Sequence, residues 1–169
     1  MYWNAVVEFP KMKVAVSTRD VNGSPRVAGI RYLPLTTDSM DPDNELAERA
    51  VRQLERYRDD PDAKFDLPLQ IEGTDFQRSV WDAMCAIPRG RTLTYGELAR
   101  KLGGDGFDVP RAVGQACGDN KLPIVIPCHR VVAAGGIGGF GHSTGGYLLE
   151  AKRWLLMHES SADAFALKP

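Results

Sequence analysis

The sequence predicts an α+β fold, in which a small N-terminal β-meander and one helix are followed by a mostly helical domain. Three observations predict this fold: apolar stretches separated by turn residues in the first third, apolar residues at helical spacing after residue 41, and two capping boxes in the second half. The chain has 169 residues, of which 43% are hydrophobic and 25% charged, as in an ordinary globular protein large enough to bury a core.

The first third of the chain has the pattern of a β-meander. Turn chemistry lies at Asn22-Gly23 and Ser24-Pro25, and strands are expected on either side of it. The expected strands are built on three apolar stretches: Ala5 to Val7, Val14 to Val16 and Val27 to Tyr32.

One amphipathic helix is expected after these strands. Asp41-Pro42 offers an N-cap followed by a first-turn proline, and Asp60-Pro61 ends the pattern. Between them, apolar residues recur at helical spacing: Leu46, Ala50, Leu54 and Tyr57.

A linker is expected at residues 62–69, which have no hydrophobic period and contain Pro68. We therefore expect two domains, one over residues 1–67 and one over residues 68–169.

Two capping boxes open short helices in the second half. Thr74 with Gln77, and Thr94 with Glu97, pair a hydroxyl with an amide or carboxylate three residues later. Pro88 is expected to end the first of these helices.

Two further helices are expected near the C-terminus. The first covers residues 110–118 and, with the helix that follows Thr94, forms a candidate helix-turn-helix motif whose connection, residues 103–109, is longer than usual. The glycine-rich residues 135–146 are expected to form a loop that approaches other groups closely. The last helix covers residues 147–159 and carries enough apolar surface to dock.

Composition bounds the location and the partners. The three cysteines, Cys85, Cys117 and Cys128, are too few and too far apart for a disulfide scaffold, so we expect reduced thiols. The first twenty residues contain neither a secretory signal nor a membrane span, so we expect a cytoplasmic location. The formal net charge of −1 argues against binding to nucleic acid by bulk electrostatics alone.

The run at residues 123–132, PIVIPCHRVV, contains the candidate nucleophile Cys128. A cysteine attacks as the thiolate, and the adjacent His129 is the obvious base. Neighbouring residues of a strand point in opposite directions, so a contact between the two side chains requires a turn or a bridging water. Composition alone favours an inert core cysteine, and a zinc site with Cys117 fits no familiar ligand spacing.

Six motifs occur in an order that resembles a known family. They are Phe76-Gln77 through Ile87-Pro88, Thr94 to Ala99, Arg111 to Gly114, Asn120, Ile126 to Val131, and Trp154 to Glu159. This series resembles the O6-alkylguanine-DNA alkyltransferases, also called methylated-DNA–protein-cysteine methyltransferases, over about residues 73–159. The resemblance implies a ribonuclease-H-like β-rich domain over residues 1–67, similar in outline only. Over residues 68–169 it implies a winged-helix-like domain that binds DNA and carries the alkyl acceptor.

The resemblance implies a direct repair reaction. Cys128 would accept the alkyl group of O6-alkylguanine irreversibly, once per molecule, with O4-alkylthymine as an open second substrate. His129 would take the thiol proton through a water, while Glu159 orients the imidazole and stabilises its charged form. Asn120 would fix the turn that holds Cys128.

The resemblance also implies how damaged DNA is held. The target base must leave the duplex to reach a buried thiol, and Arg111 would fill the gap in the stack. Ala112 and Gly114 would let their helix lie close in the minor groove. Arg130 and Tyr95 are further candidates for contact with DNA.

The guanine pocket would be lined by few groups. The Tyr95 hydroxyl would donate to the base, and the backbone carbonyls of Cys128 and Val131 would accept from its exocyclic amine. Ser143 is a candidate lining residue in loop 139–146, where the chain departs from the family pattern. No cofactor, metal, membrane or obligate protein partner is implied, and the expected partner is double-stranded DNA.

Three rival functions predict different behaviour. A lesion sensor of the same shape would lack the cysteine. A Cys-His-Glu hydrolase acting on small acyl substrates would turn over repeatedly, and a DNA-binding regulator would keep its function after Cys128→Ala.

Overall fold

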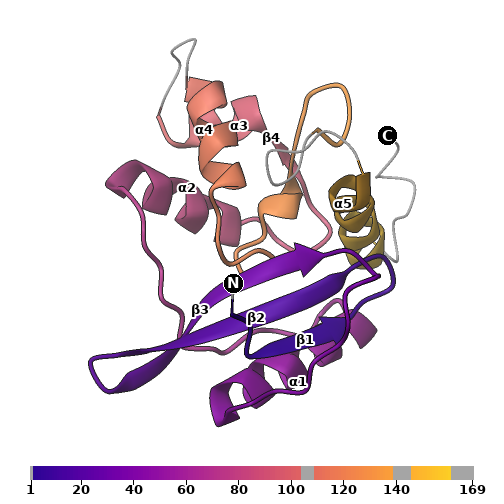
Figure 1. The fold of residues 1–169 in the computed structure, drawn as a ribbon. Coiled ribbons are helices and arrows are strands. Elements are labelled where there is room, and N and C mark those ends of the chain that lie inside the picture. The colour runs from indigo at the N-terminus through magenta and orange to yellow at the C-terminus, as the bar shows by residue number, and fades with distance from the viewer. Residues whose placement is uncertain (1, 104–108, 139–145, 161–169) are drawn as a thin grey trace. The chain divides into compact units, whose positions relative to one another are not determined.

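The computed structural model describes residues 2–103, 109–138 and 146–160 (Figure 1). The chain forms two compact units, residues 1–71 and residues 72–169. Within the described residues, no helix is both long enough and apolar enough to cross a membrane.

The first unit contains the predicted meander. Strands β1 (Ala5–Glu8), β2 (Lys13–Val21) and β3 (Ser24–Leu33) form an antiparallel sheet in the order β1-β2-β3. The turn between β2 and β3 has positive φ at both Asn22 (52°) and Gly23 (83°), as a tight hairpin turn requires. The prediction of a hairpin from the Asn-Gly pair is therefore confirmed.

Helix α1 (Glu45–Asp59) packs on this sheet through the predicted apolar residues, which are buried. Its N-cap is Asn44 and not Asp41, because the Asn44 side chain accepts from the backbone N–H of Ala47 at 2.8 Å. The helix ends at Asp59, with Asp60 as its C-cap, as Asp60-Pro61 predicted.

The expected linker is bound to the first unit. The Val27 N–H donates to the Pro68 carbonyl at 2.7 Å, and the Gln70 N–H donates to the Val27 carbonyl at 2.9 Å. The Arg49 side chain pairs with Asp66. The division between the units therefore falls after Ile71, slightly beyond the expected boundary, because these bonds hold the segment against β3.

The second unit consists mainly of helices. They are α2 (Asp75–Cys85), α3 (Tyr95–Lys101), α4 (Val109–Gly118) and α5 (Gly146–Glu159). Both predicted capping boxes are present, since the side chains of Thr74 and Thr94 accept from the backbones of Gln77 and Glu97 and receive the reciprocal bonds.

Helices α2, α3 and α4 pack against one another, which gives the predicted helix-turn-helix pair a third supporting helix. The Trp81 indole N–H of α2 donates to the Ala116 carbonyl of α4 at 2.9 Å in the buried interface.

Two short parallel strands bring distant segments of this unit together. Strand β4 (Leu93–Thr94) pairs with β5 (Val131–Val132), with Leu93 opposite Val131. Tyr95 follows β4 directly, and the 3-10 turn η1 (Cys128–Arg130) precedes β5. Because the strands are parallel, the pairing places the start of α3 level with the end of β5, a short distance beyond the turn that carries Cys128.

Candidate active site

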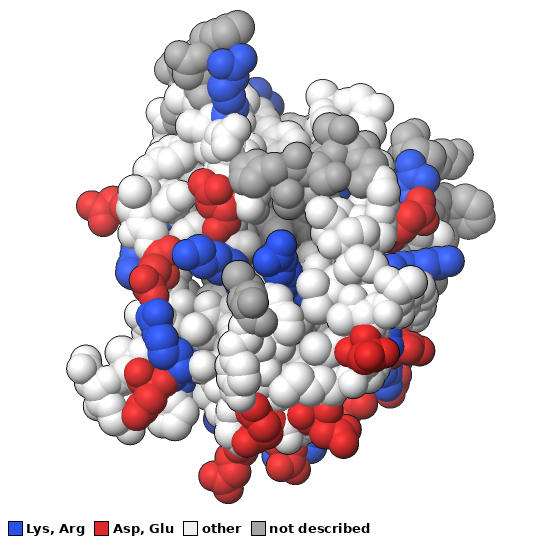
Figure 2. All heavy atoms as spheres, viewed as in Figure 1, with Lys and Arg blue, Asp and Glu red and all other residues white. Residues whose placement is uncertain are grey.

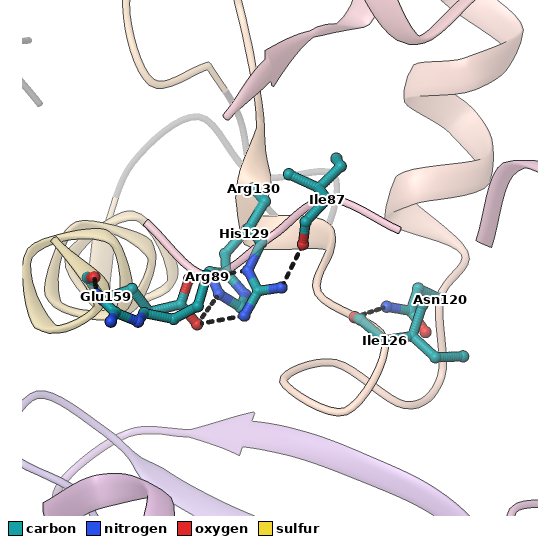
Figure 3. Close-up of polar contacts among 7 residues, drawn as sticks. All are labelled: Ile87, Arg89, Asn120, Ile126, His129, Arg130 and Glu159. Carbon is teal, nitrogen blue, oxygen red and sulfur yellow. Dashed lines mark hydrogen bonds and ion pairs between the residues drawn. The ribbon is translucent and has the colours of Figure 1, made fainter. Parts of the chain in front are cut away.

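The segment before Cys128 is a tight turn held by Asn120. The Asn120 side chain donates to the Ile126 carbonyl at 2.8 Å (Figure 3). It also accepts from the Leu122 N–H at 2.9 Å. Ile124, inside this turn, has a φ of 73°, which is strained for a β-branched residue. The predicted role of Asn120 in fixing the turn agrees with this geometry.

Cys128 begins η1 and does not lie on a strand. The Cys128 N–H donates to the Ile126 carbonyl at 2.8 Å, and Cys128 is 6% exposed. Burial raises the pKa of the Cys128 thiol to about 11, whereas a hydrogen bond from Asn120 and the charge of Lys152 act in the opposite direction. The resting thiol is therefore protonated at neutral pH and needs a base before it can attack.

His129 and Glu159 form a buried pair. The imidazole Nε2 lies 2.8 Å from Glu159 Oε2, and the pair joins η1 to the end of α5 (Figure 3). Burial lowers the pKa of His129, although its bond to Glu159 opposes the shift, so the imidazole is neutral at pH 7. A carboxylate only accepts, so Nε2 carries the proton and Nδ1 is the basic nitrogen. Nδ1 is buried and has no hydrogen-bond partner in the described part of the chain.

Two arginines fix Glu159. Arg130 donates through Nε to Oε1 at 2.9 Å and through a terminal nitrogen to Oε2 at 3.0 Å, while Arg89 donates to the Glu159 backbone carbonyl at 2.6 Å. Burial would raise the pKa of Glu159, but the bonds to His129 and Arg130 outweigh burial and hold that pKa far below its usual range. Glu159 is thus a fixed anion behind His129.

The expectation that Arg130 contacts DNA is not supported by this geometry. Its remaining terminal nitrogen donates to the Ile87 carbonyl at 2.6 Å, and its side chain is only 15% exposed. The guanidinium therefore turns inward to the carboxylate instead of outward to phosphates.

Tyr95 lies half-buried at the first position of α3. Burial raises the pKa of its hydroxyl to about 12, so the phenol keeps its proton and can donate. Gly138 has a φ of +76°, and a Cβ there would lie 3.4 Å from the Tyr95 ring and 3.1 Å from the Ala133 backbone nitrogen. The predicted close approach of the glycine-rich segment therefore occurs at Gly138, beside Tyr95.

Lys152 is a site residue that the sequence analysis missed. It lies on α5 and is fully buried, and its ammonium donates to the Val131 carbonyl at 2.8 Å. A signal was available, since Lys152, Leu155, Leu156 and Glu159 are spaced three, four and seven residues apart and so share one helix face.

The two backbone carbonyls expected to read guanine already accept one bond each. The Cys128 carbonyl accepts from the Val131 N–H, and the Val131 carbonyl accepts from Lys152. A carbonyl oxygen has two lone pairs, so each can accept a second donor.

Of the remaining predicted residues, three lie on α4 and one lies outside the described residues. Arg111 is exposed in the first turn of α4, and Ala112 and Gly114 are half-buried on the same helix. Ser143 and the rest of loop 139–145 lie outside the described residues. Among the residues that are described, no group of three or more His, Cys, Asp or Glu could hold a metal ion.

Comparison with known proteins identifies the family. The profile described as 6-O-methylguanine DNA methyltransferase, DNA binding domain, matches residues 75–161. A methylated-DNA–protein-cysteine methyltransferase of Methanosarcina acetivorans is 43% identical to the chain over 124 residues, which make up 73% of this chain and 76% of the relative. The chain belongs to this family. The resemblance inferred from the motifs is confirmed.

Further relatives and structures agree with this assignment. The methyltransferase of the same name from Mycobacterium tuberculosis is 44% identical over 121 residues, 71% of this chain and 69% of that relative. The crystal structure of Mycobacterium tuberculosis OGT in complex with DNA matches with a TM-score of 0.72 and 35% identity, covering 92% of this chain and 91% of that chain. The predicted α+β fold is confirmed by the same match.

Proposed function

We propose that this protein repairs O6-alkylguanine in double-stranded DNA by moving the alkyl group to Cys128, once per molecule. The observation that carries the proposal is the buried pair of His129 and Glu159 beside Cys128, joined at 2.8 Å. Family membership and the DNA complex of the Mycobacterium tuberculosis relative support it. We also propose a cytoplasmic location, where thiols are kept reduced.

The reaction removes the thiol proton of Cys128 and exchanges the bond between the alkyl carbon and O6 for a bond between that carbon and sulfur. The Cys128 proton passes to His129 Nδ1 through a water, and the Glu159 carboxylate stabilises the imidazolium that forms. The thiolate sulfur then attacks the alkyl carbon, and the bond from that carbon to O6 breaks with its electron pair moving to guanine. The Tyr95 hydroxyl donates to the base as this negative charge develops.

The product explains why each molecule acts once. The new carbon–sulfur bond is a thioether, which the imidazole and carboxylate beside it cannot hydrolyse. Cys128 therefore stays alkylated, and the protein behaves as a reagent consumed in the reaction.

DNA contacts are assigned to the second unit. Arg111 is exposed at the start of α4, so it can enter the base stack when the target nucleotide turns out of the duplex. The small residues Ala112 and Gly114 let the same helix approach the minor groove. Within the first unit, Figure 2 shows acidic side chains gathered over the region of α1, and such a surface repels phosphates.

Guanine recognition is assigned to three groups. The carbonyls of Cys128 and Val131 each keep a lone pair for the exocyclic amine, and the Tyr95 hydroxyl donates to the ring. Ser143 stays a candidate lining residue for bulky alkyl groups.

The experiment that tests this proposal counts transfers per molecule. The protein is mixed with an excess of duplex carrying O6-methylguanine, and restored guanine is measured by chromatography of the digested DNA. We expect a plateau at one equivalent, no reaction for Cys128→Ser, and wild-type behaviour for Cys85→Ser, whose cysteine is exposed at the end of α2. Restored guanine beyond one equivalent would refute single use of each molecule, and unchanged lesion DNA would refute alkyl transfer. The same assay with O4-methylthymine tests the second substrate.

A further inference from the structure

Lys152 is held at the end of the turn that begins with Cys128. Its ammonium donates to the Val131 carbonyl at 2.8 Å, and the N–H of Val131 in turn closes η1 by donating to the Cys128 carbonyl. The lysine is fully buried, so this position is fixed by the packing of α5. The cation therefore cannot move away into solvent when the charge at Cys128 changes.

Several titratable groups face this ammonium from the surrounding elements. They are Cys128 and His129 on η1, Cys117 on α4 and Tyr95 on α3, whose ring centroid lies 6.0 Å from the Lys152 nitrogen. Burial lowers the pKa of Lys152 to about 8, while negative charge on Cys128 and Cys117 would raise it. The ammonium is thus mostly charged at pH 7, and a thiolate stabilises it.

The positive charge of Lys152 acts on both His129 and Cys128. The positive charge of Lys152 lowers the pKa of His129, because two cations in one buried site repel. The same charge lowers the pKa of Cys128. The lysine therefore favours a thiolate beside it and disfavours a long-lived imidazolium.

We propose that Lys152 is a positioning residue whose buried ammonium stabilises the Cys128 thiolate and orients the Val131 carbonyl, while His129 only passes the proton on. The inference rests on the proposed function of Cys128 as alkyl acceptor. Lys152 keeps all its protons throughout: the thiol proton goes to His129 and then to solvent, and the standing positive charge balances the sulfur anion until the alkyl group arrives.

The test separates charge from hydrogen bonding at position 152. Lys152→Met removes both, Lys152→Gln keeps a donor toward the Val131 carbonyl without charge, and Lys152→Arg keeps the charge. Arg153→Met is the matched control, since Arg153 is the next residue of α5 and its side chain is 55% exposed.

The readout is the reaction of Cys128 with iodoacetamide, which needs no DNA. Rates are measured from pH 6 to pH 10 (about two units either side of the value for Lys152) by peptide mass spectrometry, with thermal melting to confirm folding. We expect Lys152→Met and Lys152→Gln to react about tenfold more slowly at pH 7, equivalent to a rise of about one unit in the pKa of Cys128. The difference from the wild type should shrink above pH 8, because the wild-type Lys152, with a pKa of about 8, loses its charge there. Lys152→Arg should match the wild-type rate at pH 7, and Arg153→Met should follow the wild-type profile at every pH.

Two outcomes would overturn the inference. One is a wild-type rate at pH 7 in both uncharged variants, and the other is a slowing that is equal at every pH, which a purely structural role would give. Should Lys152→Met fail to fold, Lys152→Gln carries the same test. A failure of alkyl transfer from DNA in the wild type would refute the proposed function. The iodoacetamide rates would still show whether Lys152 changes the reactivity of Cys128, because that assay needs no DNA.

Discussion

Replacing Asn120 by alanine removes the side chain that ties the turn before Cys128. The change deletes the donor to the Ile126 carbonyl and the acceptor for the Leu122 N–H. The Ile126 carbonyl still accepts from the Cys128 N–H, so it loses one of two hydrogen bonds. The N–H of the buried Leu122 loses the hydrogen bond that it donates to Asn120.

These losses set the expected magnitude. An orphaned buried N–H costs about 1–3 kcal/mol, and the second bond to a carbonyl that keeps another is worth about 1 kcal/mol. We therefore expect the free energy of unfolding to fall by about 2–4 kcal/mol. The turn also holds Ile124 at its strained φ of 73°, so its relaxation should displace Cys128 and slow alkyl transfer.

Two measurements check this prediction. Urea titration gives the free energy of unfolding, and single-turnover transfer from O6-methylguanine duplex gives the rate. Asn44→Ala is the control, because it removes the cap of α1 in the first unit and should cost about 1 kcal/mol without slowing transfer. A loss below about 1 kcal/mol for Asn120→Ala, combined with an unchanged transfer rate, would refute the reasoning.

Three further predictions address the relay and the DNA contact. Glu159→Gln removes the anion behind His129 and should slow single-turnover transfer by about 10²–10⁴-fold, the usual contribution of a general base, so a wild-type rate would contradict the relay. Burial lowers the pKa of His129, so the unfolded state takes up its proton first, and the free energy of unfolding should decline below about pH 6.5 by up to ~1.4 kcal/mol per pH unit. Urea titrations should find a shallower decline in His129→Gln; an identical slope would exclude His129 as the cause. Arg111→Ala should weaken binding to lesion duplex in a fluorescence anisotropy titration while leaving the iodoacetamide rate of Cys128 unchanged, and equal affinity would remove Arg111 from the DNA contact.

Local signals in the sequence were sufficient for most of the fold. The Asn22-Gly23 turn and the capping boxes at Thr74 and Thr94 depend on residues within a few positions of one another, and all three occur in the structure. The N-cap of α1 was wrong by a few residues because Asp41 and Asn44 are both good caps, and the chain path from β3 decides between them.

The site was predictable where a motif carried it and not where tertiary contacts decided it. Cys128, His129 and Glu159 were identified from the family motifs, and the structure brings the last two together. Arg130 was expected to face DNA, but its orientation depends on Glu159, which lies far away in the sequence. Lys152 was overlooked because a lysine is rarely buried, although its spacing from Leu155 and Leu156 placed it on the apolar face of α5.

The measurement that tests the central claim most directly is mass spectrometry of the protein after reaction with duplex carrying O6-methylguanine. Digestion and peptide sequencing should find one added methyl group, on the peptide that contains Cys128 and on its sulfur. A protein of unchanged mass, or a methyl group on Cys85 or Cys117, would contradict the assignment of Cys128 as the acceptor.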